Sequence, residues 1–186
     1  MTKEEKIIHT SIRLFNENGF HGTATSKIAK EAGVANGTLF QYFPTKENLI
    51  LASFISIKEE MKQHLLNNLS DTSNTKQLMK AHIVLSLTWA VDNPTKFAFL
   101  QQFHSSPYLY KLDSARLAEY NKPHLRIIQQ AIDEKLIKPL SVDLIYALIS
   151  SHTYGLYQFI SLQKHTKKEQ AESIEKGFEL LWKMLN

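Results

Sequence analysis

The sequence predicts an all-α protein with an N-terminal three-helix head and a larger C-terminal helical body. Only six glycines and five prolines interrupt its 186 residues, so long helical runs are possible. Apolar residues recur at helical spacing, as at Ile8, Ile12 and Phe15. Alternating β-branched residues, which would indicate strands, extend over no useful length.

The composition limits the classes of protein that the chain can belong to. Hydrophobic residues make up 43% and charged residues 22%, as in ordinary soluble domains. The absence of cysteine excludes disulfides, thiolate metal sites and cysteine nucleophiles. The start of the chain has charges where a signal peptide is apolar, and no apolar stretch reaches the ~20 residues of a membrane span. We therefore expect a cytoplasmic protein without a membrane partner.

Local signals place the helices along the chain. Thr2 and Glu5 form a predicted capping box for the first helix, which Gly19 ends in a left-handed conformation. Thr45 can cap the fourth helix, and residues 70–75 read as a polar loop. The other helices are expected at about 25–32, 36–43, 76–92, 95–104, 114–136, 142–163 and 167–185; Pro123 should kink or divide one of them, and Thr166 with Glu169 caps the last.

The segment GVANGTLFQYF, residues 33–43, joins two short helices. Gly33 stands where the turn needs a positive φ, and Ala29 is small where the helices cross. This pattern is typical of a helix-turn-helix. The apolar residues that lock the two helices are Ile28, Val34, Leu39 and Phe43.

The remaining residues of the second short helix would point outward. They are Asn36, Gly37, Thr38, Gln41 and Tyr42. Asn or Gln can pair with adenine in a major groove, and Thr can contact a thymine methyl group. A tight helical corner without a binding role remains the alternative. A phosphate-binding loop is disfavoured, because neither glycine-rich phosphate motif is present and no strand precedes the glycine.

The segment TATSKIAKEAGVANGTLFQYFPTKENL, residues 23–49, resembles the helix-turn-helix of the tetracycline-repressor (TetR) family of bacterial regulators. The resemblance covers about residues 7–51, and the rest of the chain matches only in length and helix count. It implies about nine helices, a homodimer, a palindromic double-stranded DNA operator and a pocket for a small-molecule effector. The matching positions are Phe15, Gly19, Thr25, Ile28, Ala29, Ala32, Gly33, Val34, Gly37, Leu39, Phe43, Lys46 and Leu49.

The resemblance also assigns roles in DNA binding. Two residues depart from the family pattern: Ala35 stands where a capping Ser is common, which costs ~1 kcal/mol, and Phe40 stands where Tyr is common. Phe40 would instead offer an apolar ring to a thymine or sugar. The implied roles are a helix cap and phosphate contact for Thr25, the groove edge for Ser26 and Lys27, base contacts for Asn36, Gly37, Thr38 and Gln41, and backbone contacts for Tyr42 and Lys46.

The helical body is expected to hold the dimer interface and the effector. Helices 142–163 and 167–185 would form a four-helix interface with a second subunit, or else pack within one subunit. Aromatic and titratable residues on apolar faces suggest a largely apolar effector without high charge, although each of them could equally be a core residue. The expected interface residues are Ser151, Gly155, Phe159, Ile174, Phe178 and Leu181; the expected pocket residues are Met61, His82, Trp89, Phe103, His104, Tyr120, His124, His152 and Tyr154.

These expectations define two domains, a DNA-binding domain at 1–46 and an effector-binding and dimerisation domain at 47–186. The predicted function is a sequence-specific transcriptional regulator, with repression favoured. No motif of a metalloprotease or serine hydrolase is present, so we expect neither an enzyme nor a cofactor. The alternative is a helical interaction or membrane-surface module, against which the outward polar residues argue.

Overall fold

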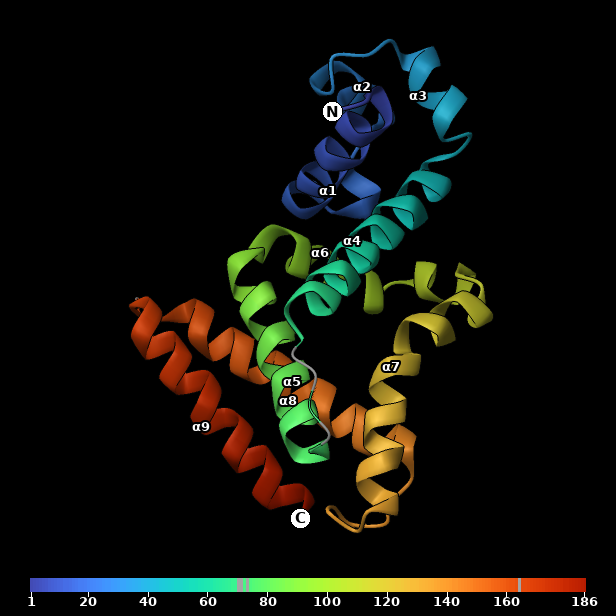
Figure 1. The fold of residues 1–186 in the computed structure, drawn as a ribbon. Coiled ribbons are helices and arrows are strands. Elements are labelled where there is room, and N and C mark those ends of the chain that lie inside the picture. The colour runs from blue at the N-terminus through green and yellow to red at the C-terminus, as the bar shows by residue number, and fades with distance from the viewer. Residues whose placement is uncertain (70–71, 73, 164) are drawn as a thin grey trace. The chain divides into compact units, whose positions relative to one another are not determined.

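The structure is a computed structural model that describes residues 1–69, 72, 74–163 and 165–186. Over these residues the chain is all-helical, with nine α-helices, one short 3₁₀ helix and no strand (Figure 1). This confirms the all-α prediction. The elements are α1 (Lys3–Gly22), α2 (Thr25–Glu31), α3 (Asn36–Tyr42), α4 (Lys46–Asn68), α5 (Thr75–Asp92), α6 (Pro94–His104), η1 (Pro107–Lys111), α7 (Ser114–Asp133), α8 (Val142–Leu162) and α9 (Lys167–Leu185).

The chain folds into two compact units that differ from the two predicted domains. The first unit contains Met1–Glu60 and Asn93–Ser114, and the second contains Met61–Asp92 and Ala115–Asn186. The long helix α4 therefore belongs to both units. The functional boundary at 46/47 stays a prediction, because compactness does not define it.

Helix α1 begins and bends as the sequence predicts. The Thr2 side chain accepts a hydrogen bond from the Glu5 backbone, and Glu5 returns one to the Thr2 backbone. Gly19 has φ 73°, which confirms the left-handed conformation. The predicted stop at Gly19 is wrong in one respect: it is a kink, and the helix continues to Gly22.

Aromatic rings fill the centre of the first unit. Phe15 and Phe20 of α1 lie with ring centroids 5.3 Å apart, and Phe20 meets Phe99 of α6 at 5.4 Å. Phe54 of α4 stacks on Phe103 of α6 at 4.1 Å. Such ring pairs stabilise a core beyond their buried area alone, so α1, α4 and α6 are held as one packed group.

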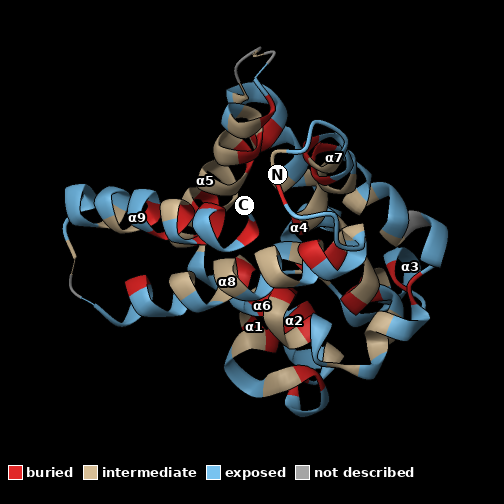
Figure 2. Cartoon of the chain, turned by 90° about the horizontal axis from the view of Figure 1, so that it is seen from below, coloured by how far each residue is buried: buried red, intermediate tan, exposed pale blue. Residues whose placement is uncertain are grey.

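The second unit packs α5, α8 and α9 against one another. Buried positions recur along all three helices (Figure 2). Two apolar clusters form here. The larger is built from Met79, Ile127, Ile128, Ala131, Ile137, Ile145, Phe178, Leu181, Trp182 and Leu185, and the smaller from Leu87, Ile160 and Ile174.

Three further features concern the predicted boundaries. Pro123 does not divide α7, which runs unbroken from Ser114 to Asp133. Thr45 and Thr166 cap α4 and α9 as predicted. Residues 70, 71 and 73 of the expected polar loop lie outside the described residues.

Across the part of the chain that the structure describes, no helix is both long and apolar enough to cross a membrane.

Helix α8 packs closely against α9 at Gly177. A Cβ atom at Gly177 would lie 2.1 Å from Leu156 Cδ2. The His152 ring also lies at hydrogen-bond distance, with Nε2 2.9 Å from the Gly177 carbonyl oxygen. Ser151 and Gly155, which are expected to face a second subunit, are exposed within this one.

Two helical glycines provide a test of this packing. We expect Gly177→Ala to lower the free energy of unfolding by about 1–2 kcal/mol, because Leu156 must move within a packed cluster. Gly37→Ala in α3 is the control, because a Cβ atom there would meet no atom within 4 Å; it should raise the free energy of unfolding by up to about 1 kcal/mol through helix propensity. Urea unfolding at one protein concentration measures both values. Equal effects of the two substitutions would contradict the close packing at Gly177.

Candidate nucleic-acid interface and effector region

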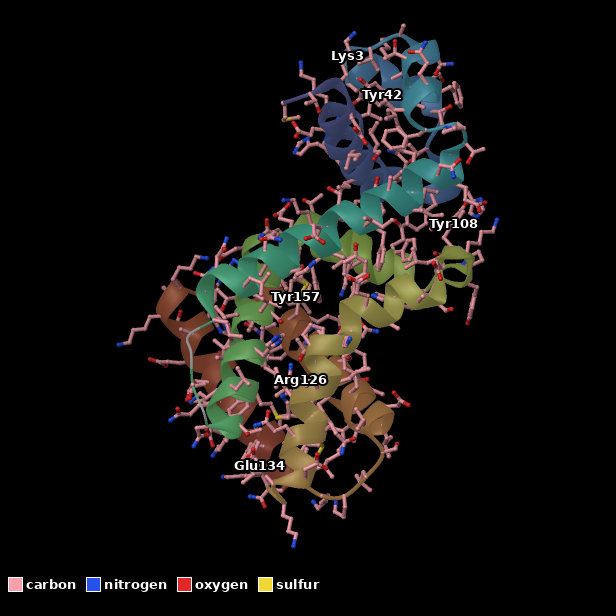
Figure 3. The ribbon with its side chains drawn as sticks, turned by 45° about the vertical axis from the view of Figure 1, so that its right-hand side comes forward. Lys3, Tyr42, Tyr108, Arg126, Glu134 and Tyr157 are labelled. Carbon is pink, nitrogen blue, oxygen red and sulfur yellow. The ribbon has the colours of Figure 1, made fainter. Side chains whose placement is uncertain are left out.

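Helix α3 separates its residues into an inner and an outer side. Leu39 and Phe43 are 0% and 4% exposed and pack inward. Phe40 and Tyr42 are 39% and 44% exposed, and Tyr42 lies on the three-helix head (Figure 3). The polar residues follow the same division: Asn36, Gly37 and Gln41 are exposed, and Thr38 is half-buried.

The turn before α3 has the geometry of a helix-turn-helix. Gly33 has φ 69°, as predicted. The Val34 backbone N–H donates to the Ala29 carbonyl oxygen at 3.0 Å, which closes α2 onto the turn. Ala29 and Ile28 are 2% and 0% exposed, so they pack where the two helices meet. The Gly33 turn and the packing of Ile28 and Ala29 therefore fix the orientation of α3 relative to α2.

The start of α3 is weakly capped. Ala35 occupies the N-cap, and no side chain makes a capping hydrogen bond there, which confirms the expectation drawn from the sequence. A Cβ atom on Gly37 would meet nothing within 4 Å. The backbone at this end of α3 is therefore open to a close approach by another molecule.

Helix α2 differs from the expectation at its first residue. Its N-cap is Ala24, which makes no side-chain hydrogen bond, and Thr25 is the first helical residue. The predicted capping role of Thr25 is therefore wrong, although its half-buried side chain keeps the predicted phosphate contact open. Ser26 and Lys27 are exposed, as a groove-edge role requires.

Lys46 has a structural partner in addition to its predicted phosphate contact. Its ammonium donates to the His21 carbonyl oxygen at 3.3 Å, which joins the end of α1 to the start of α4. Partial burial lowers the pKa of Lys46 below its ordinary value. Replacing Lys46 would therefore disturb the head as well as any phosphate contact.

The nine expected effector residues divide between the two units. Phe103 and His104 lie in the first, where Phe103 is 0% exposed and stacks on Phe54. The second holds Met61, His82, Trp89, Tyr120, His124, His152 and Tyr154. Some of these have evident structural roles, because Trp89 is 3% exposed and the Tyr154 hydroxyl accepts a hydrogen bond from Gln158.

A polar cluster in the second unit includes two of the expected residues. The rings of His82 on α5 and His124 on α7 meet edge to face, with centroids 4.6 Å apart. Tyr146 of α8 lies 6.1 Å from His124 and donates a hydrogen bond to Asn121 Oδ1 at 3.1 Å. Burial lowers the pKa of His82 and raises that of Tyr146, so both groups favour their neutral forms.

Sequence reasoning missed Tyr146, Asn121 and one charged residue, Lys58. Lys58 of α4 is half-buried, and burial lowers its pKa to about 8. His104 keeps an exposed surface, yet the protein around its ring and, secondarily, the charge of Lys58 lower its pKa. Lys58 stands one turn after Phe54 on α4, where apolar residues recur at Ile50, Phe54, Ile57, Met61 and Leu65.

The expected dimer interface needs correction. Ile174, Phe178 and Leu181 are 5%, 1% and 1% exposed, because they pack against α5 and α8 inside the second unit. Their side chains have no surface to offer a second subunit. Ser151, Gly155 and Phe159 do lie on the surface of α8. Four exposed apolar residues were not expected: Leu144 and Leu162 on α8, and Leu180 and Met184 on α9.

Metal chemistry has no obvious site in the described residues. They contain no group of three or more His, Asp or Glu side chains placed to hold an ion.

Comparison with known proteins supports the helix-turn-helix interpretation of the head. The family described as "Bacterial regulatory proteins, tetR family" matches residues 7–53, which contain most of α1, all of α2 and α3, and the start of α4. The fatty acid metabolism regulator protein of Bacillus subtilis is 43% identical over 63 residues, or 34% of this chain. The aligned part spans only 31% of that regulator's length.

Whole-chain similarity comes from solved structures. A putative tetR family transcription regulator from Shewanella sp. PV-4 has a TM-score of 0.85 and 29% identity, covering 100% of this chain and 98% of the other. The regulator FadR from Bacillus subtilis, in complex with stearoyl-CoA, has a TM-score of 0.74 and 25% identity, covering 98% and 99%. Residues 7–53 therefore match the tetR family of bacterial regulatory proteins, and the whole chain is similar in fold to solved tetR family regulators.

Proposed function

We propose that the protein is a sequence-specific DNA-binding transcriptional regulator that acts as a homodimer in the bacterial cytoplasm. The observation that carries this proposal is the division of α3: Leu39 and Phe43 are buried, whereas Asn36, Gly37 and Gln41 face outward. A helix held in this way can enter a major groove without unfolding its support. Residues 1–46 form the DNA-binding domain, and 47–186 the effector-binding and dimerisation domain.

Different residues supply affinity and specificity in this proposal. Contacts to phosphates position the head, and contacts to base edges read the sequence. Asn36, Thr38 and Gln41 contact base edges, and the hydroxyl group of the exposed Tyr42 binds the DNA backbone. Two heads related by a twofold axis would read half-sites about 34 Å or more apart. Selection of bound sequences from random DNA tests the proposal, which requires a palindrome with a fixed spacing.

Substitutions at Thr38 and Tyr42 are expected to change DNA binding in different ways. Thr38→Ala should relax the preference at one position of the half-site by about 1–3 kcal/mol. Tyr42→Phe should weaken binding to selected and random DNA alike, because it removes a phosphate contact. Competition binding at one salt concentration measures both. Equal losses on selected and random DNA for Thr38→Ala would refute its role as a reader.

Homodimerisation is supported by an apolar stripe on α8 and α9. Leu144, Ser151, Gly155, Phe159 and Leu162 recur on one face of α8 at helical spacing. Leu180 and Met184 extend the stripe on α9, at 63% and 46% exposure. Large apolar side chains exposed in a row mark an interaction site. We assign the dimer interface to these residues in place of Ile174, Phe178 and Leu181.

The proposed effector is largely apolar and releases the protein from its operator, which makes repression the expected mode of regulation. The polar cluster of His82, His124 and Tyr146 lies among apolar residues of α5, α7 and α8, as is common in ligand sites. Since FadR from Bacillus subtilis was solved with stearoyl-CoA, a ligand with a long fatty acyl chain and no CoA group is the first effector to test. An effector that binds without changing operator affinity would contradict this mechanism.

A further inference from the structure

A surface groove in the first unit has no role in the function proposed above. Its volume is about 400 Å³, and it is lined by residues 18–22 of α1, by Gln102 of α6 and by residues 105–108. None of the proposed DNA-reading or effector residues contributes to this lining. The groove is large enough for a small organic molecule, so its chemistry decides what such a molecule would be.

The lining favours an uncharged and flat ligand. It contains no Asp, Glu, Lys or Arg. One wall is aromatic, because Phe20 and Tyr108 meet edge to face with ring centroids 5.4 Å apart. Tyr108 stands on η1, is half-buried and lines the groove (Figure 3), and Lys111 Nζ lies 6.0 Å from the centroid of its ring. A planar ring can pack against such a wall.

Gln102 provides polar recognition in the groove. Its Oε1 atom is buried and has no hydrogen-bond partner within the described residues. Neighbouring polar groups are engaged: Ser106 Oγ donates to the Phe103 carbonyl oxygen, and Asn18 Nδ2 donates to that of Leu14. A buried acceptor without a partner is unfavourable, and the last torsion of a carboxamide turns readily. Gln102 Nε2 lies 3.6 Å from the position of a Cβ atom on Gly19, a lining residue, so a half turn of the carboxamide would bring Oε1 to that side.

We propose that this groove binds a small, uncharged, planar heterocycle with a neighbouring N–H and C=O, of the nucleobase or lactam class. With the carboxamide turned, the heterocycle N–H would donate to Gln102 Oε1. The ring would lie against Tyr108. This contact gives Oε1 the hydrogen bond that it lacks within the described residues, which a hydrocarbon would not do.

The position of the groove gives the ligand a route to the DNA-reading helix. One wall is the end of α1, at the Gly19 kink, and α1 packs against α2, α3 and α6. A molecule bound between α1 and α6 favours one placement of these helices over others. The ligand is thus a second regulatory input, and this consequence alone rests on the proposed function.

Binding is tested on the full chain without DNA. Uracil is the probe, and 1,3-dimethyluracil, which lacks both N–H groups, is its matched control. We expect calorimetry or ligand-observed NMR to show uracil binding in about the millimolar range, as suits so small a ligand. The affinity of the dimethyl compound should be lower than that of uracil by a factor of about ten or more. No uracil binding, or equal binding of both compounds, would overturn the proposal.

Two variants connect the binding to Gln102. Gln102→Leu should weaken uracil binding about tenfold or more, and thermal unfolding should show a folded protein, because the substitution removes a polar atom without a partner. Gln101→Leu, on the same helix but outside the lining, should leave uracil binding unchanged. Equal losses in both variants would refute the site. Operator affinity, measured separately with and without uracil, reports on regulation and cannot decide the binding result.

Discussion

Aspartate at both Phe159 and Leu180 is expected to give a folded monomer that loses operator binding by about 10³-fold or more. The two side chains are 49% and 63% exposed in the subunit, so the change removes little internal packing beyond the contact between the Phe159 and His165 rings. In the dimer, four carboxylates would have to be buried at an interface of apolar residues, which is strongly unfavourable. Specific sites are typically bound at ~10⁻⁸–10⁻¹¹ M, and a single head retains only half of these contacts.

Light scattering on a sizing column, at micromolar protein, measures the state of the variant directly. The matched control carries aspartate at Leu66 and Tyr110, which are 62% and 90% exposed but lie on α4 and η1. This control should remain a dimer. If the Phe159→Asp/Leu180→Asp variant were still a dimer, the interface would lie elsewhere. Our assignment of the interface to the exposed residues of α8 and α9 would then be wrong.

Features that depend on local chemistry could be predicted from the sequence. Gly33 and Gly19 adopt positive φ because their turns require it, and few other residues tolerate that conformation. Thr2 with Glu5 and Thr166 with Glu169 form capping boxes because each pair is only three residues apart. The inward position of Leu39 follows from the same short-range geometry. The candidate reading surface was therefore accessible from residues 25–46 alone.

Features that depend on tertiary packing could not be predicted in the same way. The stripe through Ile174, Phe178 and Leu181 shows that one side of α9 is buried, but periodicity does not say whether the same subunit or a second one covers it. The structure assigns that stripe to the core and leaves Leu180 and Met184 outside. The close packing of α8 against α9 at Gly177 likewise depends on where Leu156 of α8 lies.

Lys58 is an instructive case because a signal was present in the sequence. It lies four residues after Phe54 and three before Met61, inside the apolar stripe of α4. A lysine at such a position either reaches solvent with its long side chain or is desolvated. Only the surroundings of the folded chain decide between these outcomes, and they lower its pKa to about 8.

Lys58→Met is therefore expected to stabilise the protein at neutral pH. Burial lowers the pKa of Lys58 from 10.5 to about 8, so the charged form is less favourable in the folded chain than in the unfolded one. At about 1.4 kcal/mol for each pKa unit, this costs on the order of 3 kcal/mol. Methionine has a similar length and no charge. We expect the free energy of unfolding to rise by about 1–3 kcal/mol at pH 7, since the contacts of the ammonium are lost as well.

The pH dependence distinguishes this explanation from better packing of methionine. A lysine whose folded pKa is lowered destabilises the protein fully below about pH 8, and the effect shrinks as the pH rises from about 8 towards 10.5. The advantage of Lys58→Met should therefore be large at pH 6.5 and small at pH 10. Lys62→Met, at an exposed position one turn later, should show no such trend. An advantage that stays constant from pH 6.5 to 10 would mean that desolvation of the Lys58 ammonium is not its cause.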